Sequence, residues 1–511
     1  MASTYSIAQS FLLAVCIYVL YKIVKYFTSE TNEIQARSRS NKRRLGVSEE
    51  CMDILSTEKP GASNICLAIS IKSEECLVRQ HVCDALILLA KRQPMLRAVI
   101  TTVTSGDKYF EIKDINEVIT MLDITTSDVK ASDWQDVWFE YTARQSGNGL
   151  LWRVVILKEE FIFDTREYMN TLMFNFEHSC TDGVSSIKFC KQFLHNMNEL
   201  ANGTSGVDQE ISRSKSLELL PEVHEIVTRG RIWHALYNLL LTYCCLRPIL
   251  RFCMKKILPQ IMEKKPNNPY HEQFPPDQKS INTRAPCRLN VKVFSEKETS
   301  DIIQTCRANN CTVTAAVITA AHLAFCKLLD SEKSKDSKID YLFAIDGQRF
   351  CDPKPNKDYL GHFVYIQQNC HMKYTAGDCS DFWKLAKDTT EEIKTCVKGR
   401  GCVAELTVIS GLMKTIELMK LFFNDKLFPK SSCNFISSFG SFNLENDGNY
   451  KLNACFINNL VHGSNCTFSH FIHTINGKMT WQIASNLTVY SEHADAFANR
   501  CYDKLIEVSR S

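Results

Sequence analysis

Short apolar stretches alternate with amphipathic segments along most of the chain, and this alternation indicates a mixed α/β protein. Residues 171–177 give the clearest strand, because apolar side chains at every second position define one strongly apolar face. Residues 75–92 repeat apolar side chains at helical spacing instead, and Pro94 then breaks the helix. The same patterns predict strands at 66–71, 96–103, 151–157 and 287–294, and helices at 295–308, at 314–329 and after Gly183. This order of elements predicts an α/β (α+β) fold.

The N-terminal segment predicts a membrane anchor. Residues 1–21 carry no charged side chain, and at 1.5 Å per residue they cover about 30 Å, the thickness of a hydrocarbon layer. Seven basic residues follow before residue 45, which places the rest of the chain in the cytosol. A cleaved signal peptide is disfavoured, because no basic residue precedes the apolar stretch and no small-residue cleavage site follows it. We therefore predict a membrane protein, of the endoplasmic reticulum, with the rest of its chain in the cytosol.

A second apolar segment lies between the two halves of the chain. Residues 232–246 lack a full charge but are too short to span a bilayer unaided. Arg247, Arg251 and Lys255 then recur every four residues beside apolar side chains. This pattern suits a helix at an anionic membrane surface, and it suits equally an ordinary core helix with a solvated end.

Proline, asparagine and charge are frequent from residue 261 to 286, where we place a crossover between two domains. The predicted divisions are a transmembrane anchor at 1–27, a basic linker at 28–50, an N-terminal domain at 51–230, an amphipathic membrane-associated segment with the proline-rich crossover at 231–286, and a C-terminal domain at 287–511.

Composition narrows the function classes. The 511 residues are 45% hydrophobic and 23% charged, so the chain is globular and too long for one core. Sixty basic against fifty-seven acidic side chains give a net charge of +3, which argues against a nucleic-acid partner. The 23 cysteines show no zinc-ligand spacing, so we predict no metal site. In a cytosolic domain they should be reduced thiols, and a structural disulfide would contradict that compartment.

One short motif carries candidate chemistry. His178, Asp182 and Gly183 form H-x-x-x-D-G directly after the strand at 171–177. A histidine that leaves the apolar face of a strand is partly desolvated and stays neutral, as a general base requires. Asp182 can fix the turn that orients it, and Gly183 leaves room for a ligand near the backbone. The motif alone also suits a structural histidine beside a helix cap, and its function stays open.

The order of further segments around this motif resembles the acyl-coenzyme A-dependent acyltransferases of the chloramphenicol acetyltransferase-like superfamily, which includes condensation domains. Glu177 stands where condensation domains of peptide synthetases carry a second histidine, and no D-F-G-W-G segment of the plant branch is present. The chain is therefore most similar to the alcohol acetyltransferase branch. The matching segments are Arg92 to Arg97, Leu151 to Val154, His178 to Gly183, Thr312 to Ala316, Asp346 to Arg349 with Leu360 to Val364, Ile436 to Gly440, and Asn476 to Met479.

This resemblance implies two similar α/β domains with mixed sheets that meet at a central tunnel. His178 would take a proton from the acceptor, without a covalent acyl-enzyme. The implied substrates are acyl-CoA, with an acetyl group, and a hydrophobic alcohol, and no cofactor is held permanently. Asp182 would be structural and pair with Arg349, and Ser437 or Ser438 would support the oxyanion. We expect a monomer with a membrane and no nucleic acid as partner.

Other residue patterns in the sequence suggest different chemistry. Cys180 lies two positions from His178, but that spacing does not make a thiol nucleophile face the base. His470 and His473 are three apart in a strand, so their rings point to opposite faces rather than to one metal. The glycines at 399 and 401 follow a helix pattern, unlike a dinucleotide site. Acylation of an amine stays open, as does an inactive membrane-tethered scaffold or lipid-binding protein of the same fold. Acyl length and the identity of the acceptor also stay open.

Overall fold

The computed structural model describes residues 41–59, 61–144, 149–203, 215–229, 237, 246–276, 288–375, 381–422, 430–444, 447–460, 466–486 and 488–510. The predicted anchor at 1–27 and most of the predicted linker lie outside these residues. No helix within the described ranges has both the length and the apolar character that crossing a membrane requires.

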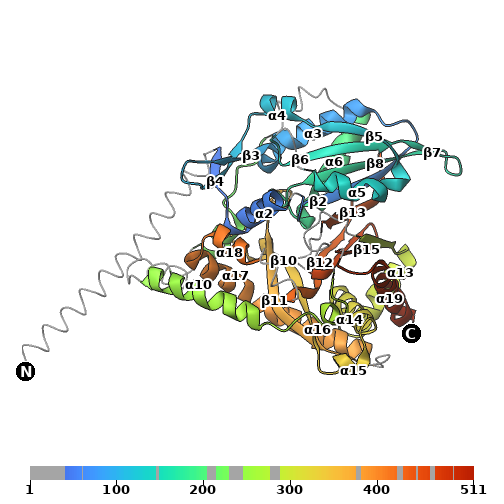
Figure 1. Ribbon diagram of the computed structural model, residues 1–511. Coiled ribbons are helices and arrows are strands. Elements are labelled where there is room, and N and C mark those ends of the chain that lie inside the picture. Colours follow the sequence, from blue (N-terminus) through green and yellow to red (C-terminus); the bar gives the residue numbers. More distant parts are fainter. Residues whose placement is uncertain are drawn as a thin grey trace, which may run out of the picture.

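The molecule consists of two lobes, each built on a mixed six-stranded sheet with helices (Figure 1). The sheet of the N-terminal lobe has the order β13-β2-β8-β6-β5, and β7 pairs with β8. Strands β5 and β6 are parallel, whereas β8 runs antiparallel to both of its main neighbours. The bounds are β2 Ile65–Ser73, β5 Ile124–Lys130, β6 Trp152–Lys158, β7 Glu160–Ile162, β8 Glu167–Phe176 and β13 Lys451–Asn459.

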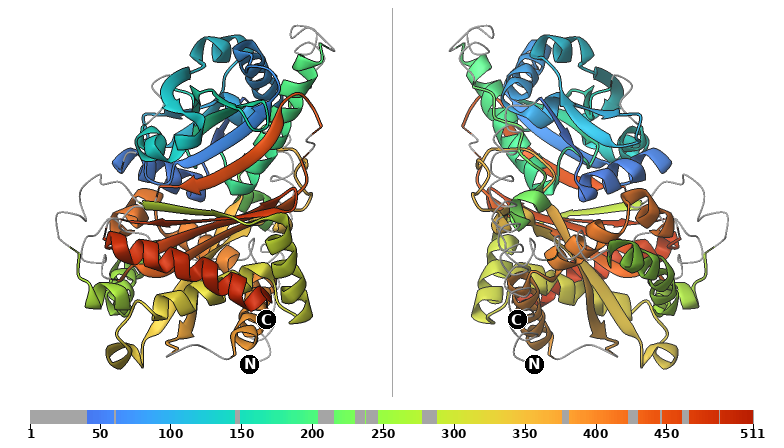
Figure 2. Two further views of the ribbon diagram at one scale, coloured as in Figure 1. Left: turned by 90° about the vertical axis from the view of Figure 1, so that its right-hand side faces the viewer. Right: turned by 90° about the vertical axis from the view of Figure 1, so that its left-hand side faces the viewer.

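The sheet of the C-terminal lobe has the order β11-β10-β12-β14-β15-β9. Its strands β10, β12 and β14 are parallel, and the outer pairs are antiparallel. Helices α14, α16 and α19 pack together below this sheet (Figure 2). The bounds are β9 Arg288–Val293, β10 Lys338–Asp346, β11 Val364–Lys373, β12 Ser432–Phe442, β14 Cys466–Ile475, β15 Lys478–Ser485, α13 Glu296–Ala308, α14 Val313–Cys326, α15 Ser331–Ser334, α16 Phe382–Gly399, α17 Gly401–Leu412, α18 Thr415–Phe422 and α19 Ser491–Arg510.

Strand β8 is buried on both faces, whereas the sequence predicted one strongly apolar face. The expected face is present, because Phe174 packs edge-on against Phe189 and Phe193 of helix α6. The opposite face is covered by helix α5, and its polar member Asn175 donates to the Thr142 and Arg144 carbonyls at 3.2 and 2.9 Å. A buried amide is stable only when its hydrogen bonds are made. The remaining bounds in this lobe are β3 Ala98–Thr102, β4 Lys108–Ile112, α2 Val47–Glu58, α3 Arg79–Arg92, α4 Ile115–Met121, α5 Trp134–Ala143, α6 Gly183–Ala201 and α8 Val223–Thr228.

The two lobes are not consecutive along the chain. Strand β13 comes late in the sequence, yet it pairs antiparallel with β2 at the edge of the N-terminal sheet (Figure 2). Trp138 Nε1 donates to Asn458 Oδ1 at 2.5 Å, and the Asn458 amide donates to Gln482 Oε1 on β15 at 2.9 Å. The predicted domain at 287–511 therefore contributes one strand to the other lobe. An alternating pattern in the sequence can predict that residues 451–459 form a strand, but it cannot predict which sheet the strand joins.

The predicted linker at 28–50 also needs a correction. Residues Lys42–Arg44 form strand β1, which pairs with β4 in a small three-stranded sheet, and helix α2 begins at Val47. Arg43 makes two hydrogen bonds of 2.7 Å to the Glu49 carboxylate, and this bidentate pair fixes the strand beside the helix. The basic residues counted as a linker are therefore partly structural.

The predicted crossover at 261–286 contains more regular structure than predicted, because two helices lie partly or wholly inside it. Helix α10 (Leu246–Lys264) extends into it and ends before Pro266. Pro269 opens the short helix α11 (Pro269–Gln273) at its first position, where the missing N–H has no partner to lose. The apolar segment at 232–246 lies outside the described residues except for Tyr237 and Leu246.

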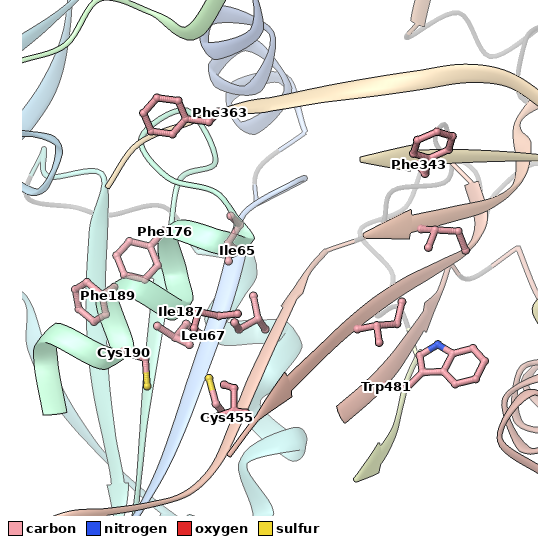
Figure 3. Close-up of a cluster of buried hydrophobic side chains, with 14 of the residues drawn as sticks. Ile65, Leu67, Phe176, Ile187, Phe189, Cys190, Phe343, Phe363, Cys455 and Trp481 are labelled. Carbon is pink, nitrogen blue, oxygen red and sulfur yellow. The ribbon is translucent and has the colours of Figure 1, made fainter. Parts of the chain in front are cut away.

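The cysteines that the structure describes are eighteen free thiols, most of them buried. Cys190 of α6 and Cys455 of β13 lie together within the hydrophobic cluster of Figure 3, and their thiols are hydrogen-bonded. These side chains act as small apolar core residues.

Candidate active site

The candidate site lies where β8 ends and α6 begins. His178 occupies the turn directly after β8, and Asp182 is the N-cap of α6. The Asp182 Oδ1 atom accepts a hydrogen bond of 2.7 Å from the Ser185 amide. An N-cap carboxylate satisfies one of the unpaired amides of the first turn, so the sequence T-D-G ends the loop and starts the helix.

A cavity of about 590 Å³, including its open mouth, lies between the lobes at this point. Both lobes contribute to its lining, which is mainly apolar with a few polar groups. The lining residues are Ile65, His178, Asp182, Gly183, Val184, Ala344, Ile345, Asp346, Val364, Phe435, Ser437, Ser438, Phe439, Ile457, Asn458, Asn459 and Phe471. Five of the six predicted site residues are among them, namely His178, Asp182, Gly183, Ser437 and Ser438, whereas Arg349 is not.

His178 is held in one orientation. Its Nδ1 lies 2.8 Å from the Thr181 carbonyl oxygen, and because a carbonyl only accepts, Nδ1 carries the proton. Nε2 is then left with its lone pair. Burial, with a smaller effect of the neighbouring His362, lowers the pKa of His178 to about 4. The imidazole is therefore neutral at pH 7 and can accept a proton through Nε2.

A second histidine touches the first, and the sequence analysis did not identify it as a site residue. The Nδ1 atoms of His362 and His178 are 3.3 Å apart, and the rings meet edge to face at 72°. His362 Nε2 lies 2.6 Å from the Ser48 hydroxyl, and the Thr181 carbonyl also serves as its partner. Burial lowers the pKa of His362 as well. The available signal was the L-G-H-F-V segment, since the similar family has asparagine at this place.

Asp182 joins the two lobes. Its Oδ2 atom accepts a hydrogen bond of 2.9 Å from the Phe363 amide of the C-terminal lobe, and its side chain is almost fully buried. Arg349, the expected partner, is exposed, and within the described residues the carboxylate is bonded to the Ser185 and Phe363 amides instead. The predicted Asp182–Arg349 pair is therefore wrong. Burial and the nearby Asp182 raise the pKa of Asp346, and Arg349 offsets only part of this rise.

The segment that carries His362 is fixed by a buried glutamine. Gln93 Nε2 donates to the Asp358 carbonyl at 2.8 Å, and its Oε1 accepts from the Leu360 amide at 3.1 Å. The Ser185 hydroxyl adds a hydrogen bond of 2.8 Å to the Gly361 carbonyl. Two motifs that stand far apart in the sequence, around Gln93 and around His362, therefore meet beside the candidate site.

Gly183 has a packing role. A Cβ at this position would collide with the ring of Phe439, which reaches across from β12. The space beside Gly183 is therefore filled by protein, where we expected room for a ligand. Phe439 lines the cavity, so the glycine lets an aromatic wall approach the start of α6.

Ser437 and Ser438 lie next to each other on β12. Alternation places Ser437 on the same face as Phe435 and Phe439, toward the cavity. Ser438 also lines the cavity, and its oxygen accepts a hydrogen bond of 2.9 Å from the Thr314 hydroxyl of α14. Because this bond uses an acceptor site of Ser438, its own hydroxyl proton remains available to donate.

Cys180 does not meet the requirements of a nucleophile. Its side chain is buried, and its thiol donates to the Glu177 and Leu151 carbonyls. Burial raises the pKa of this thiol well above its ordinary value, which disfavours the reactive thiolate.

His470 and His473 do not share a partner. His470 is hydrogen-bonded to Asn434 and Trp481, whereas His473 is hydrogen-bonded to the Cys455 carbonyl.

Solved structures with the same fold are found among acetyltransferases and peptide synthetases. The TRI3 trichothecene 15-O-acetyltransferase from Fusarium sporotrichioides is 12% identical with a TM-score of 0.65, covering 91% of this chain and 95% of its own. Polyketide synthase associated protein 5 from Mycobacterium tuberculosis is 12% identical with a TM-score of 0.59, and the coverage is 92% and 98%. The epimerization domain of tyrocidine synthetase B is 13% identical with a TM-score of 0.55, and the coverage is again 92% and 98%. The fold is thus that of the chloramphenicol acetyltransferase-like and condensation-domain proteins.

A family model narrows this class. The model described as alcohol acetyltransferase matches residues 127–501, which include the candidate site. The chain belongs to the alcohol acetyltransferase family, and it is accordingly an acyltransferase. No curated protein sequence matches the chain significantly.

We predict that Asp182→Asn weakens the junction between the lobes. The amide can accept from only one of the two backbone amides and turns its own NH₂ group toward the other. Hydrogen bonds to a charged group are worth about 1.5–3 kcal/mol, so the free energy of unfolding should fall by about that amount. Chemical denaturation measures it. Asp381→Asn is the matched control, because Asp381 is an exposed N-cap of α16 without a side-chain capping bond. Equal losses in both variants would contradict the role of Asp182.

We predict that His362→Asn moves the pH profile of acyl transfer. Without a second imidazole at 3.3 Å, one source of the lowered pKa of His178 is lost. The acid limb of kcat/KM should then move to higher pH, while the rate near neutral pH falls less than in His178→Ala. His371→Asn, an exposed histidine of β11, should leave the profile unchanged. An unmoved acid limb in His362→Asn would show that His362 does not act on His178.

Proposed function

We propose that the protein transfers an acyl group from a coenzyme A thioester to the hydroxyl of a hydrophobic alcohol, and that its preferred acyl group is acetyl. The observation that supports this most directly is the neutral His178 imidazole, whose Nδ1 is bonded to the Thr181 carbonyl and whose ring lines a mainly apolar cavity between the lobes. Membership of the alcohol acetyltransferase family supports the same reaction.

In the proposed reaction, His178 Nε2 takes the proton of the acceptor hydroxyl as its oxygen attacks the thioester carbonyl. A carbon–oxygen bond forms, and the carbonyl oxygen takes negative charge. When the tetrahedral intermediate collapses, the carbon–sulfur bond breaks and the departing thiolate takes the proton from the imidazolium. The histidine ends as it began, so no acyl-enzyme and no permanently bound cofactor are needed. A low pKa of His178 favours the second proton transfer, because the imidazolium is then a strong acid.

The lining of the cavity supports an apolar acceptor. Ile345, Val364, Phe435 and Phe471 surround the polar groups, and an alcohol with a hydrocarbon body would bury its apolar surface against them.

We also propose that the enzyme works at a membrane of the endoplasmic reticulum, with its catalytic part in the cytosol. The uncharged stretch at 1–21 and the free thiols support this.

We predict that His178→Ala lowers turnover by about 10²- to 10⁴-fold, the usual contribution of a general base. The measurement is ester formation by the full chain from a panel of acyl-CoA thioesters and alcohols, analysed by mass spectrometry. Unchanged thermal unfolding should accompany the loss, and His371→Ala should retain full activity. Equal transfer by wild type and His178→Ala would refute the proposal, and so would a wild type that acylates amines in preference to alcohols.

We assign Ser438 as the oxyanion donor, because the Thr314 hydroxyl donates to its oxygen and leaves its proton free. Ser438→Ala should lower kcat by about 100- to 1,000-fold with a small change in KM. Thr314→Val should lower kcat in the same direction but by less. Ser441→Ala, on the exposed end of the same strand, is the control and should be neutral. A larger loss in Ser437→Ala than in Ser438→Ala would transfer the assignment to Ser437.

A further inference from the structure

Helix α10 lies at the side of the C-terminal lobe (Figure 1), and several of its apolar side chains are exposed to solvent. The side chains of Ile249, Phe252, Ile257 and Ile261 are 60%, 62%, 50% and 60% exposed. Ile249, Ile257 and Ile261 are separated by multiples of four residues, and Phe252 follows Ile249 by three, so together the four side chains cover about half of the helix circumference. We call these four residues the outer face of α10.

The opposite side of α10 holds the helix to the protein. Arg251 and Lys255 both bond to the Glu417 carboxylate of α18, at 2.9 and 2.7 Å. These charge-assisted hydrogen bonds lower the pKa of Glu417 to about 2, so the carboxylate is ionised at physiological pH. Met254 and Leu258 pack beside them against Leu412 and Met413.

This arrangement corrects one of the two sequence interpretations of the basic residues. The row of Arg251 and Lys255 was the predicted membrane face, but it faces α18 and is paired. Successive residues of a helix are turned by about 100°, so Ile249 lies roughly 160° and Ile257 roughly 120° around the helix from Arg251. The apolar residues point away from the lobe, and the described protein does not cover them.

Exposed apolar side chains are concentrated at this place. The described residues include fifteen exposed large hydrophobic side chains, and α10 alone carries five of them, counting Leu250. Val408 of α17 and Ile416 of α18 add two more on the helices against which α10 packs. Apolar patches of this kind on a soluble surface mark contact sites.

Charge distinguishes between the possible occupants. The sequence of α10 contains five basic residues and one acidic residue, Glu263. Lys256 and Lys264 are exposed, and the Lys256 amine lies 5.2 Å from the Phe252 ring. A lysine beside an apolar ring can bury its stem and place its amine among anionic headgroups. A second copy of the chain would bring the same positive charges together, so it fits this face less well.

We propose that the outer face of α10 lies in the surface of an anionic lipid bilayer, with its apolar side chains among the acyl chains and its lysines at the headgroups. This inference does not depend on the proposed reaction. Four partly inserted apolar side chains together with two lysines give an affinity that is weak alone and effective beside another membrane attachment.

The chain contains a native probe of this contact. Cys253 is exposed on α10, in the same helical row as Ile249 and Ile257, whereas Cys76 is exposed in the other lobe. The experiment treats the full chain with a water-soluble maleimide, without vesicles and with vesicles of phosphatidylcholine containing about 30% phosphatidylserine. Mass spectrometry follows each cysteine separately. Vesicles should slow modification of Cys253 at least about fivefold and leave Cys76 unchanged.

Variants separate insertion of α10 from general attachment of the chain. The double variant Phe252→Ser with Ile257→Ser removes apolar exposed side chains and should restore the modification rate of Cys253 in the presence of vesicles. Phe163→Ser is the matched control, because Phe163 is 83% exposed beyond β7 in the other lobe. Thermal unfolding should be unchanged in both. Protection of Cys253 that persists in the double variant would overturn the proposal. The proposal would also be overturned if vesicles did not slow the modification of Cys253. The same holds if raising the protein concentration without vesicles were enough to slow it, because a second copy of the chain would then cover this face.

Discussion

The carboxylate of Asp182 is the interaction on which the candidate site depends. One oxygen caps the helix of the N-terminal lobe that follows His178, and the other accepts an amide of the C-terminal lobe. The turn between His178 and Asp182 is thereby tied to both lobes at once. The Thr181 carbonyl, which orients the imidazole, belongs to the same turn. A buried carboxylate is costly unless its hydrogen bonds are made, so the position of the two lobes and the orientation of His178 are fixed together.

Burial determines the protonation states of the groups around this junction. Burial keeps both histidines neutral, and it raises the pKa of Asp346 at the edge of the cavity. Two imidazoles whose Nδ1 atoms are 3.3 Å apart cannot easily both become positively charged. The pair therefore responds to a new charge in the cavity as a unit. The hydroxyl groups of Ser437 and Ser438 provide polarity there without adding a full charge.

Local patterns predicted what is local in this structure. The alternation of apolar side chains correctly predicted β8, and the helices predicted after Gly183 and at 295–308 are α6 and α13. The order of family motifs predicted the two-lobed fold and which segments surround His178. The errors concern contacts between distant segments. The spacing of residues could not show that Phe363 rather than Arg349 meets Asp182, or that Phe439 fills the space beside Gly183. From the sequence, His362 could be noticed only as a departure from the family motif. Its role depends on its short distance to His178, which residue spacing does not show.

The crossing of β13 has a consequence for the synthesis of the chain. Strand β2 is complete early, but its outer partner begins only at Lys451. Until that residue leaves the ribosome, one edge of the N-terminal sheet has unpaired backbone groups, which are templates for association with other chains. At about 5–20 residues per second, several hundred residues correspond to tens of seconds of exposure. The N-terminal lobe is therefore not an autonomous folding unit, and a nascent chain of this protein is a natural client for chaperones that shield open sheet edges.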